Sequence, residues 1–156
     1  MVAVVQRVSR ASVTVDNSVL GKIGTGLLVL VGAENGDTQT DAELLAAKIS
    51  KLRIFTDEND KMNLSVLDVS GGVLAISNFT LLADTKKGNR PSFFNALEPN
   101  AALKLYDYFC ECLKSNGINS VQKGEFGTDM KVDLLNDGPV TIILNTELWK
   151  NENRNS

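Results

Sequence analysis

The stretch Leu27-Leu28-Val29-Leu30-Val31 is an uninterrupted run of five large apolar residues. Because the side chains of a strand alternate between the two faces of a sheet, such a run is typical of a strand that is covered on both faces. We therefore expect this strand to lie at the centre of a sheet. The run is far too short to span a bilayer, and the N-terminus lacks a basic region followed by an apolar one, which predicts a cytoplasmic protein that does not contact a membrane.

Other strand-like segments surround this run along the chain. The apolar and β-branched residues that strands favour recur in several short segments, at residues 2–8, 11–15, 19–23, 73–81, 121–125, 130–135 and 140–144. Two helices are predicted between them. The first opens at Thr40-Asp41-Ala42-Glu43 with a hydroxyl cap and an acidic first turn, and the second covers residues 100–114 and is stopped by Asn116-Gly117.

Many short strands with only two separated helices favour an α+β fold over a doubly wound parallel one, which would need more crossover helices. We predict a mostly antiparallel, β-barrel-like sheet. The apolar face of the first helix is expected from residues in its middle and end, namely Leu44, Leu45, Ala47, Ile49 and Leu52. At 156 residues the chain is long enough for one domain, predicted over residues 1–150, with a polar C-terminal tail at residues 151–156.

The composition restricts the possible chemistry. Hydrophobic residues make up 43% of the chain and charged residues 22%, which excludes a disordered or fibrous protein. The net charge is -3, so any contact with RNA must be local. The chain has no histidine, and therefore no Ser-His or Cys-His dyad. Two cysteines, Cys110 and Cys112, without histidine do not favour a metal site, and we expect them to be reduced.

The segment Ser77-Asn78-Phe79-Thr80 places hydroxyls, an amide and backbone N–H groups where a predicted strand ends. Backbone donors at such a turn can form an oxyanion hole. The alternative is that Ser77 and Thr80 only satisfy backbone groups at the strand end. Thr80 has no histidine to activate it as a nucleophile, so positioning and polarisation are the roles expected of it.

A compact basic loop follows, Lys86-Lys87-Gly88-Asn89-Arg90, with Phe93 and Phe94 after it. Basic side chains beside aromatic ones suit phosphate contact and base stacking, although a solvated loop whose phenylalanines return to the core is an equal alternative. Phe126 and Met130 could lie against a flat apolar ring or belong to the core.

The stretch Leu135-Asn136-Asp137-Gly138-Pro139-Val140-Thr141 interrupts a β-like pattern. Gly138 permits backbone angles that are closed to other residues, and Pro139 fixes φ and removes an N–H donor. This combination predicts a β-hairpin loop or, alternatively, a backbone segment directed at a ligand. Arg7 lies among apolar residues of a strand and needs acceptors, which backbone carbonyls could supply.

Taken together, these segments resemble the D-aminoacyl-tRNA deacylase family almost from end to end. The motifs that carry the resemblance are Val4-Val5-Gln6-Arg7-Val8, Ala11-Ser12-Val13-Thr14-Val15, Gly26-Leu27-Leu28-Val29-Leu30, Leu52-Arg53-Ile54-Phe55, Lys61-Met62-Asn63-Leu64-Ser65, Arg90-Pro91-Ser92-Phe93, Phe126-Gly127 and Asn136-Asp137-Gly138-Pro139-Val140-Thr141. The resemblance implies a homodimeric, β-barrel-like enzyme that needs no cofactor or metal. Its substrate would be the ester between a D-amino acid, or glycine, and the terminal adenosine of tRNA.

The resemblance also implies roles for individual residues. Gly138 and Pro139 match a pair with a cis bond that enters the partner subunit's active site and rejects L-residues by its backbone carbonyls. Arg7 matches the residue that orients this pair, and Thr141 lies in the same motif. Phe126 and Met130 match the region that receives the terminal adenine. Ser77, Asn78, Phe79 and Thr80 match the catalytic signature, with the N–H groups of Phe79 and Thr80 as oxyanion donors and the ribose hydroxyl of the substrate as a helper. On their charge, and not through the resemblance, Lys86, Lys87 and Arg90 are expected to contact tRNA phosphates.

Asn78 departs from the glutamine that is usual in this signature. The shorter amide could lose a hydrogen bond or reach its partner through water. Two alternatives to an active hydrolase therefore stay open. One is a module that binds the 3′ end of tRNA with weak or no turnover, and the other is a structural dimerisation protein in which Gly138-Pro139 is only part of the interface.

Overall fold

The computed structural model of the protein describes residues 1–152, with side chains described as far as residue 150. Of the polar tail predicted at residues 151–156, residues 153–156 lie outside the described part. The elements in chain order are β1 (Val2–Val15), β2 (Ser18–Ile23), β3 (Gly26–Gly32), α1 (Gln39–Lys51), β4 (Phe55–Thr56), β5 (Met62–Leu64), β6 (Gly72–Ser77), a 3-10 turn η1 (Phe79–Leu82), α2 (Pro99–Ser115), β7 (Val121–Lys123), β8 (Lys131–Asn145) and α3 (Thr146–Glu152). The fold is α+β, as predicted, with a third short helix that the sequence pattern did not indicate.

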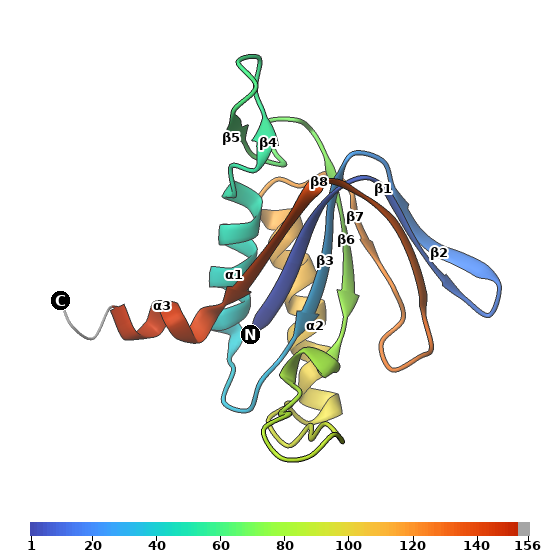
Figure 1. The fold of residues 1–156 in the computed structure, drawn as a ribbon, viewed down its shortest axis with the longest axis vertical. Helices are drawn as coiled ribbons and strands as arrows, with labels where there is room; N and C mark the ends of the chain where they lie inside the picture. Colours follow the sequence, from blue (N-terminus) through green and yellow to red (C-terminus); the bar gives the residue numbers. More distant parts are fainter. Residues whose placement is uncertain (153–156) are drawn as a thin grey trace.

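The apolar run at residues 27–31 forms β3 in the middle of the larger sheet, whose strands follow the order β2, β1, β3, β6 and β7, with β8 on the other side of β1 (Figure 1). Leu27 and Val29 face the cluster that the helices cover, and Leu28 lies in a second cluster on the concave side of the sheet. This two-sided burial explains why the run does not alternate with polar residues. The three pairings of β1 are antiparallel, whereas β3–β6 and β6–β7 are parallel.

Strand β1 is one continuous strand and not the two strands predicted at residues 2–8 and 11–15. Its first half lies between β3 and β8, and its second half lies between β2 and β8. The residues between the two predicted segments, Ser9 and Arg10, are exposed, which weakens the apolar pattern there without interrupting the backbone. The strand curls around the second core cluster and gives the sheet its barrel-like shape (Figure 1).

The hairpin interpretation of residues 135–141 is wrong. Both of its flanks belong to the single strand β8, and both pair with β1. Gln6 pairs with Thr141 and Val8 pairs with Asn136, so residues 137–140 bulge out of β8 opposite the single residue Arg7. The sequence signal marked a real break in regular structure, but the chain continues in the same direction after it.

Helices α1 and α2 pack on one face of the sheet and on each other (Figure 1). Helix α1 begins one residue before the predicted Thr40, because Thr38 and Asp41 form a capping box in front of it. Of the predicted apolar face, Leu45 and Ile49 are fully buried, but Leu44 is 41% exposed and Ala46 is buried in its place. Helix α2 starts at Pro99 behind the Glu98 cap, one residue before the predicted start, and ends at Ser115, where Asn116 caps it at the predicted stop.

Cys110 and Cys112 are both free thiols within α2 and both are buried. Burial raises the pKa of Cys110 to about 11. The thiol therefore stays protonated, and Cys110 acts as a core residue. In the part of the chain that the structure describes, no helix combines the length and apolarity that crossing a membrane requires.

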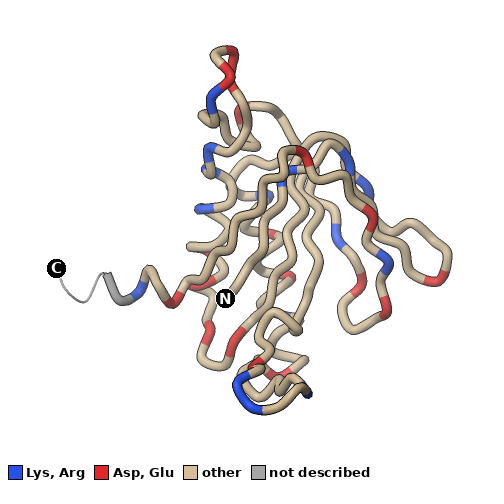
Figure 2. Tube along the Cα trace, viewed as in Figure 1, with Lys and Arg blue, Asp and Glu red and all other residues tan. Residues whose placement is uncertain are grey.

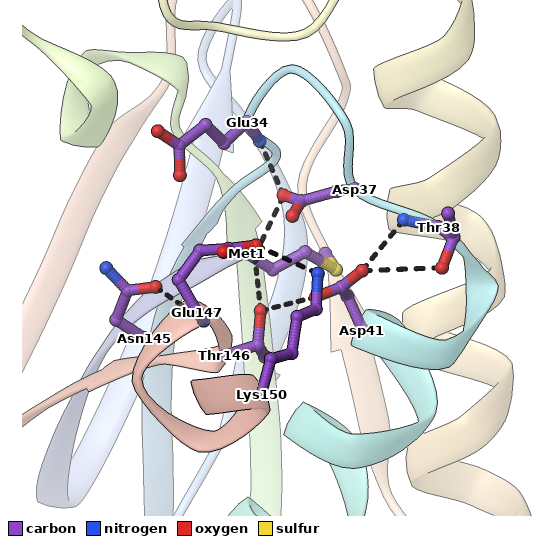
Figure 3. A network of polar contacts seen from close by, with 9 residues as sticks. All are labelled: Met1, Glu34, Asp37, Thr38, Asp41, Asn145, Thr146, Glu147 and Lys150. Carbon is purple, nitrogen blue, oxygen red and sulfur yellow. Dashed lines mark hydrogen bonds and ion pairs between the residues drawn. The ribbon is translucent and has the colours of Figure 1, made fainter. Parts of the chain in front are cut away.

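A buried polar network joins the N-terminus, α1 and α3 (Figure 3). The Met1 ammonium lies 2.8 Å from an Asp37 carboxylate oxygen and donates to Thr146 Oγ1 at 2.7 Å. Thr146 Oγ1 donates in turn to Asp41, which Lys150 also contacts at 2.8 Å. The network fixes α3 against the start of α1, and its charges compensate one another.

Acid is expected to weaken this network through Asp41. Burial raises the pKa of the Asp41 carboxyl, but hydrogen bonds from Lys150, Thr146 and Thr38 outweigh it and lower the pKa from 3.8 to about 2. The folded pKa lies below the unfolded one, so the stabilisation is complete above pH 4 and is lost as the pH falls towards 2. We expect a loss of about 2 kcal/mol over that interval.

Urea unfolding at pH 6, 4, 3 and 2 would measure this loss for the wild type and for Asp41→Asn. The difference in free energy of unfolding between the two proteins should shrink as the pH falls from 4 to 2. Asp133→Asn is a matched control, because the Asp133 side chain is 73% exposed, and it should leave the pH profile unchanged. If the free energies of unfolding of wild type and Asp41→Asn differ by the same amount at all four pH values, the Asp41 carboxylate is not the source of the pH-dependent stabilisation.

Candidate functional site

A cavity of about 570 Å³ opens between the ends of β3 and β6, the start of α2 and the segment before β8. Strands β3 and β6 are parallel, with Val31 paired to Ser77, so both end at this edge. The lining is mostly apolar and comprises Met1, Leu30, Val31, Gly32, Ala33, Ile76, Ser77, Asn78, Phe79, Phe93, Ala96, Leu97, Glu98, Pro99, Ala102, Tyr106, Phe126, Gly127, Thr128, Met130 and Val132. An apolar hollow with a few polar groups at one end is the usual form of a small-molecule site.

Two of the predicted groups of residues meet in this cavity. Ser77, Asn78 and Phe79 line one side, and Phe126 and Met130 line it from the segment between β7 and β8. The groups are separated by more than 40 residues in the sequence, and the parallel arrangement of β6 and β7 brings them together. Thr80 does not belong to the lining.

The turn after β6 is held by Asn78. Its N–H donates to Val31 O at 2.8 Å, and its side-chain Oδ1 accepts from the Thr80 N–H at 3.2 Å and from the Thr80 hydroxyl. In this structure the Asn78 side chain therefore engages the Thr80 N–H, which was predicted to be an oxyanion donor. Among the described residues, the Phe79 N–H makes no hydrogen bond.

Aromatic rings form much of the cavity wall. Phe79 and Phe93 meet edge to face at a centroid distance of 5.0 Å, and Tyr106 and Phe126 lie 6.4 Å apart. Tyr106 is buried and donates its hydroxyl to Ala75 O at 2.6 Å. Burial raises the pKa of Tyr106, and the neighbouring Cys110 raises it further, so the phenol remains a protonated donor.

Sequence reasoning missed Phe93 and Tyr106 as lining residues. Phe93 follows the basic loop, and Tyr106 lies in an amphipathic helix, where an aromatic residue is normally assigned to the core. Neither position carries a local pattern that separates a cavity wall from a core. Whether Tyr106 lines the cavity or lies in the core depends on how α2 packs against the end of β6.

The residues around Gly138 form a second group, apart from the cavity. Arg7 donates from Nε to Asp137 O at 2.9 Å and from Nη1 to Ile54 O at 2.7 Å, and its side chain is 11% exposed. Backbone carbonyls therefore satisfy this arginine, as predicted. The Gly138–Pro139 peptide bond is cis, and Gly138 has a φ of 147°. Neither residue lines the cavity of its own chain.

Asn136 closes the base of the bulge and was not among the predicted site residues. Its Oδ1 accepts from the Val140 N–H at 3.0 Å and its Nδ2 donates to Val140 O at 3.2 Å. The predicted Thr141 accepts from Gln6 Nε2 at 3.2 Å. These contacts satisfy polar groups that the interrupted pairing with β1 leaves open.

The basic loop lies at the lower end of the molecule in Figure 2. Lys86, Lys87 and Arg90 are all exposed. The pairing of Asp84 with Ser92 closes the loop, and Asp84 Oδ1 accepts from the Lys86 N–H at 2.9 Å. The residue after this closure is Phe93, which lines the cavity.

Three carboxylates outside the cavity lie close enough to share a cation. Ligand oxygens of Asp37, Asp41 and Glu147 are within 4.8 Å of one another. The Met1 ammonium and Lys150 already pair with these groups. These three carboxylates therefore belong to the polar network of Figure 3, in which protein cations already pair with them.

Comparison with known proteins places these features in a family. The family model described as D-Tyr-tRNA(Tyr) deacylase matches residues 4–145. A D-aminoacyl-tRNA deacylase of Ruegeria sp. (strain TM1040) is 53% identical over 156 residues, which is 100% of this chain and 99% of the relative. One of Paracoccus denitrificans (strain Pd 1222) is 58% identical over 142 residues, which is 91% of this chain and 95% of the relative.

Solved structures agree with this assignment. A structure described as c-Myc DNA Unwinding Element Binding Protein is 44% identical, with a TM-score of 0.87 over 93% of this chain and 98% of the other. One described as a probable eukaryotic D-amino acid tRNA deacylase is 16% identical, with a TM-score of 0.76 over 92% of this chain and 97% of the other, and it supports the fold alone. The sequence match over nearly the whole length and the shared fold lead to one conclusion: this chain belongs to the D-aminoacyl-tRNA deacylase family.

Proposed function

We propose that this protein hydrolyses the ester that joins a D-amino acid, or glycine, to the 3′-terminal adenosine of tRNA. The observation that carries the proposal is the cavity, which combines the polar turn at residues 77–79 with the apolar wall of Phe126 and Met130. An adenine ring suits the apolar end, and an ester carbonyl suits the polar end. Membership of the family supplies the reaction class.

In the proposed reaction, a water oxygen attacks the ester carbonyl carbon, the bond to the ribose oxygen breaks, and a proton from the water passes to that oxygen. The products are the free amino acid and a tRNA with a free ribose hydroxyl at its 3′ end. The Phe79 N–H is the donor available to the developing oxyanion. No histidine is present to activate the water. The ribose hydroxyl next to the ester is proposed to take part in this activation.

Chiral selection is assigned to Gly138 and Pro139 of a partner subunit. Within one chain these residues lie outside the cavity lining, so they would act on a substrate only across a dimer interface. Residues 137–139 of the bulge are exposed, and Arg7 and Asn136 anchor it, which suits a rigid projection. Its backbone carbonyls would crowd the side-chain position of an L-residue and leave room for a D-residue or glycine.

Deacylation of D-tyrosyl-tRNA and L-tyrosyl-tRNA by the purified protein would test the proposal. Rapid loss of the D-ester with slow loss of the L-ester is expected, and equal rates would contradict chiral selection. Size-exclusion chromatography with light scattering would test the dimer. A monomer that still discriminates between the two esters would contradict a cross-subunit filter.

A second candidate function is binding of the tRNA 3′ end with weak or no turnover. The observation that favours it is the contact of Asn78 Oδ1 with the Thr80 N–H, which removes one donor from the polar turn. Tight binding of tRNA without ester cleavage, with cleavage appearing in Asn78→Gln, would support this candidate. Full activity of the wild type would exclude it.

Thr80→Ala tests whether the threonine hydroxyl takes part in the chemistry. The hydroxyl contacts Asn78 and lies outside the cavity lining, so we expect a reduction of kcat of less than about tenfold and an unchanged preference for the D-ester. Single-turnover deacylation of both tyrosyl esters measures the two quantities. Loss of all activity with normal folding would assign a direct chemical role to Thr80.

A further inference from the structure

Phe94 is the most exposed of the large apolar side chains in the described part of the chain, at 86%. An exposed phenylalanine forgoes the stabilisation that burial of its ring would contribute to the fold. Its neighbour Phe93 is half-buried and lines the cavity. Two adjacent phenylalanines thus have opposite environments, one in the cavity lining and one in solvent.

The segment that carries Phe94 is held in place by its backbone. Asn35 Nδ2 donates to Phe94 O at 2.9 Å, and the Asn35 N–H donates to Asn95 O at 2.9 Å. Two residues later, the Leu97 N–H donates to Ala33 O at 2.9 Å. The ring is therefore presented to solvent from a fixed support, which reduces the entropy lost when a partner binds to it.

Positive charge lies next to this ring. Residues 84–95 contain three basic side chains and one acidic one, a net charge of +2 in a chain whose net charge is -3. Among the ion pairs of the described residues, none involves Lys86, Lys87 or Arg90. The charges are thus available to an anionic partner, and the closure of the loop by Asp84 and Ser92 keeps them near Phe94.

An exposed aromatic ring beside unpaired basic side chains is the combination that binds single-stranded nucleic acid, with bases stacked on the ring and phosphates near the charges. We propose that Phe94 stacks on the base of the unpaired nucleotide next to the terminal adenosine, while the basic loop contacts the adjoining phosphates. This inference rests on the proposed function, because it takes the terminal adenosine to occupy the cavity. It adds a second recognition point outside the cavity.

The experiment compares two substrates that differ only in the nucleotides before the terminal adenosine. D-tyrosyl-tRNA has these nucleotides, and 3′-O-D-tyrosyl adenosine lacks them. Phe94→Ala should raise KM for the tRNA roughly tenfold with kcat nearly unchanged, because loss of one stacked base has an effect of that order. The same variant should hydrolyse the adenosine ester like the wild type, and Phe94→Tyr should restore the KM for the tRNA.

Met62→Ala is the matched control. Met62 is an apolar residue that is 56% exposed, and it begins β5 at the opposite end of the molecule from the basic loop (Figure 1). It should change neither KM. Equal effects of Phe94→Ala on both substrates, or no effect on either, would overturn the inference.

Failure of the proposed function would be visible separately. If the wild type cleaves neither ester, the hydrolase proposal fails. Binding of a single-stranded RNA that ends in a 3′ adenosine and carries no amino acid then tests whether Phe94 stacks on a base. Fluorescence anisotropy should then show weaker binding for Phe94→Ala than for the wild type and Phe94→Tyr. Equal binding by all three proteins would overturn the inference in that case.

Discussion

Gly138→Ala is expected to reduce the preference for D-tyrosyl-tRNA over L-tyrosyl-tRNA by about tenfold or more, a change of about 1.4 kcal/mol in discrimination. Gly138 has a φ of 147°, a region that L-residues rarely adopt. A Cβ there would lie 2.7 Å from both Val140 Cγ2 and Val140 N and 3.3 Å from Arg7 Nη2. The bulge must therefore shift, and the backbone carbonyls assigned to chiral selection shift with it.

Asp137→Ala is the matched control for this prediction. Arg7 Nε contacts the Asp137 carbonyl at 2.9 Å but its carboxylate only at 3.8 Å, and that carboxylate is 59% exposed. Removing the side chain keeps the main-chain contact, so the D over L ratio should stay within about twofold of the wild type. Unchanged discrimination in Gly138→Ala, with circular dichroism showing a folded protein, would place chiral selection elsewhere.

Gly26→Ala is expected to lower the free energy of unfolding by about 3 kcal/mol or to prevent folding. Gly26 of β3 pairs with Gly72 of β6, and a Cβ on Gly26 would lie 1.9 Å from Gly72 O and 2.8 Å from Gly72 N. Both contacts are with backbone, so no side chain can move to relieve them. The strands would have to separate where the central pairing of the sheet begins.

Gly24→Ala provides the comparison in the same turn. No atom lies within 4 Å of a Cβ built at Gly24, so we expect a change below about 0.5 kcal/mol. Urea unfolding of both variants gives the two values directly. Similar stabilities for Gly26→Ala and Gly24→Ala would mean that the close approach of β3 and β6 is not a constraint on this fold.

The sequence predicted best where burial alone determines structure. The apolar run at residues 27–31 indicated a strand covered on both faces, and β3 is that strand. Positions on helix α1 were predicted less well, because Leu44 and Ala46 differ in burial according to how α2 packs and not according to hydrophobicity. Local periodicity does not contain that information.

In the candidate site, too, the position of the polar residues was predictable from the sequence, and their contacts were not. The strand end at residues 77–80 was predicted from polar residues after an apolar run, and three of the four line the cavity. Asn78 is the N-cap of η1, and its Oδ1 accepts a hydrogen bond from the Thr80 N–H, a contact that depends on the geometry of this turn. The sequence revealed the substitution but not the new hydrogen bond.

The bulge at Gly138 marks a change in the core that β8 contacts. Five residues of β1, Gln6 to Arg10, face seven residues of β8, Leu135 to Thr141. Before the bulge, Val132 and Leu134 pack against the second core cluster, and after it Ile142 and Leu144 pack in the cluster that the helices cover. In terms of assembly, the bulge is a crossing point: the two halves of one strand complete two different cores.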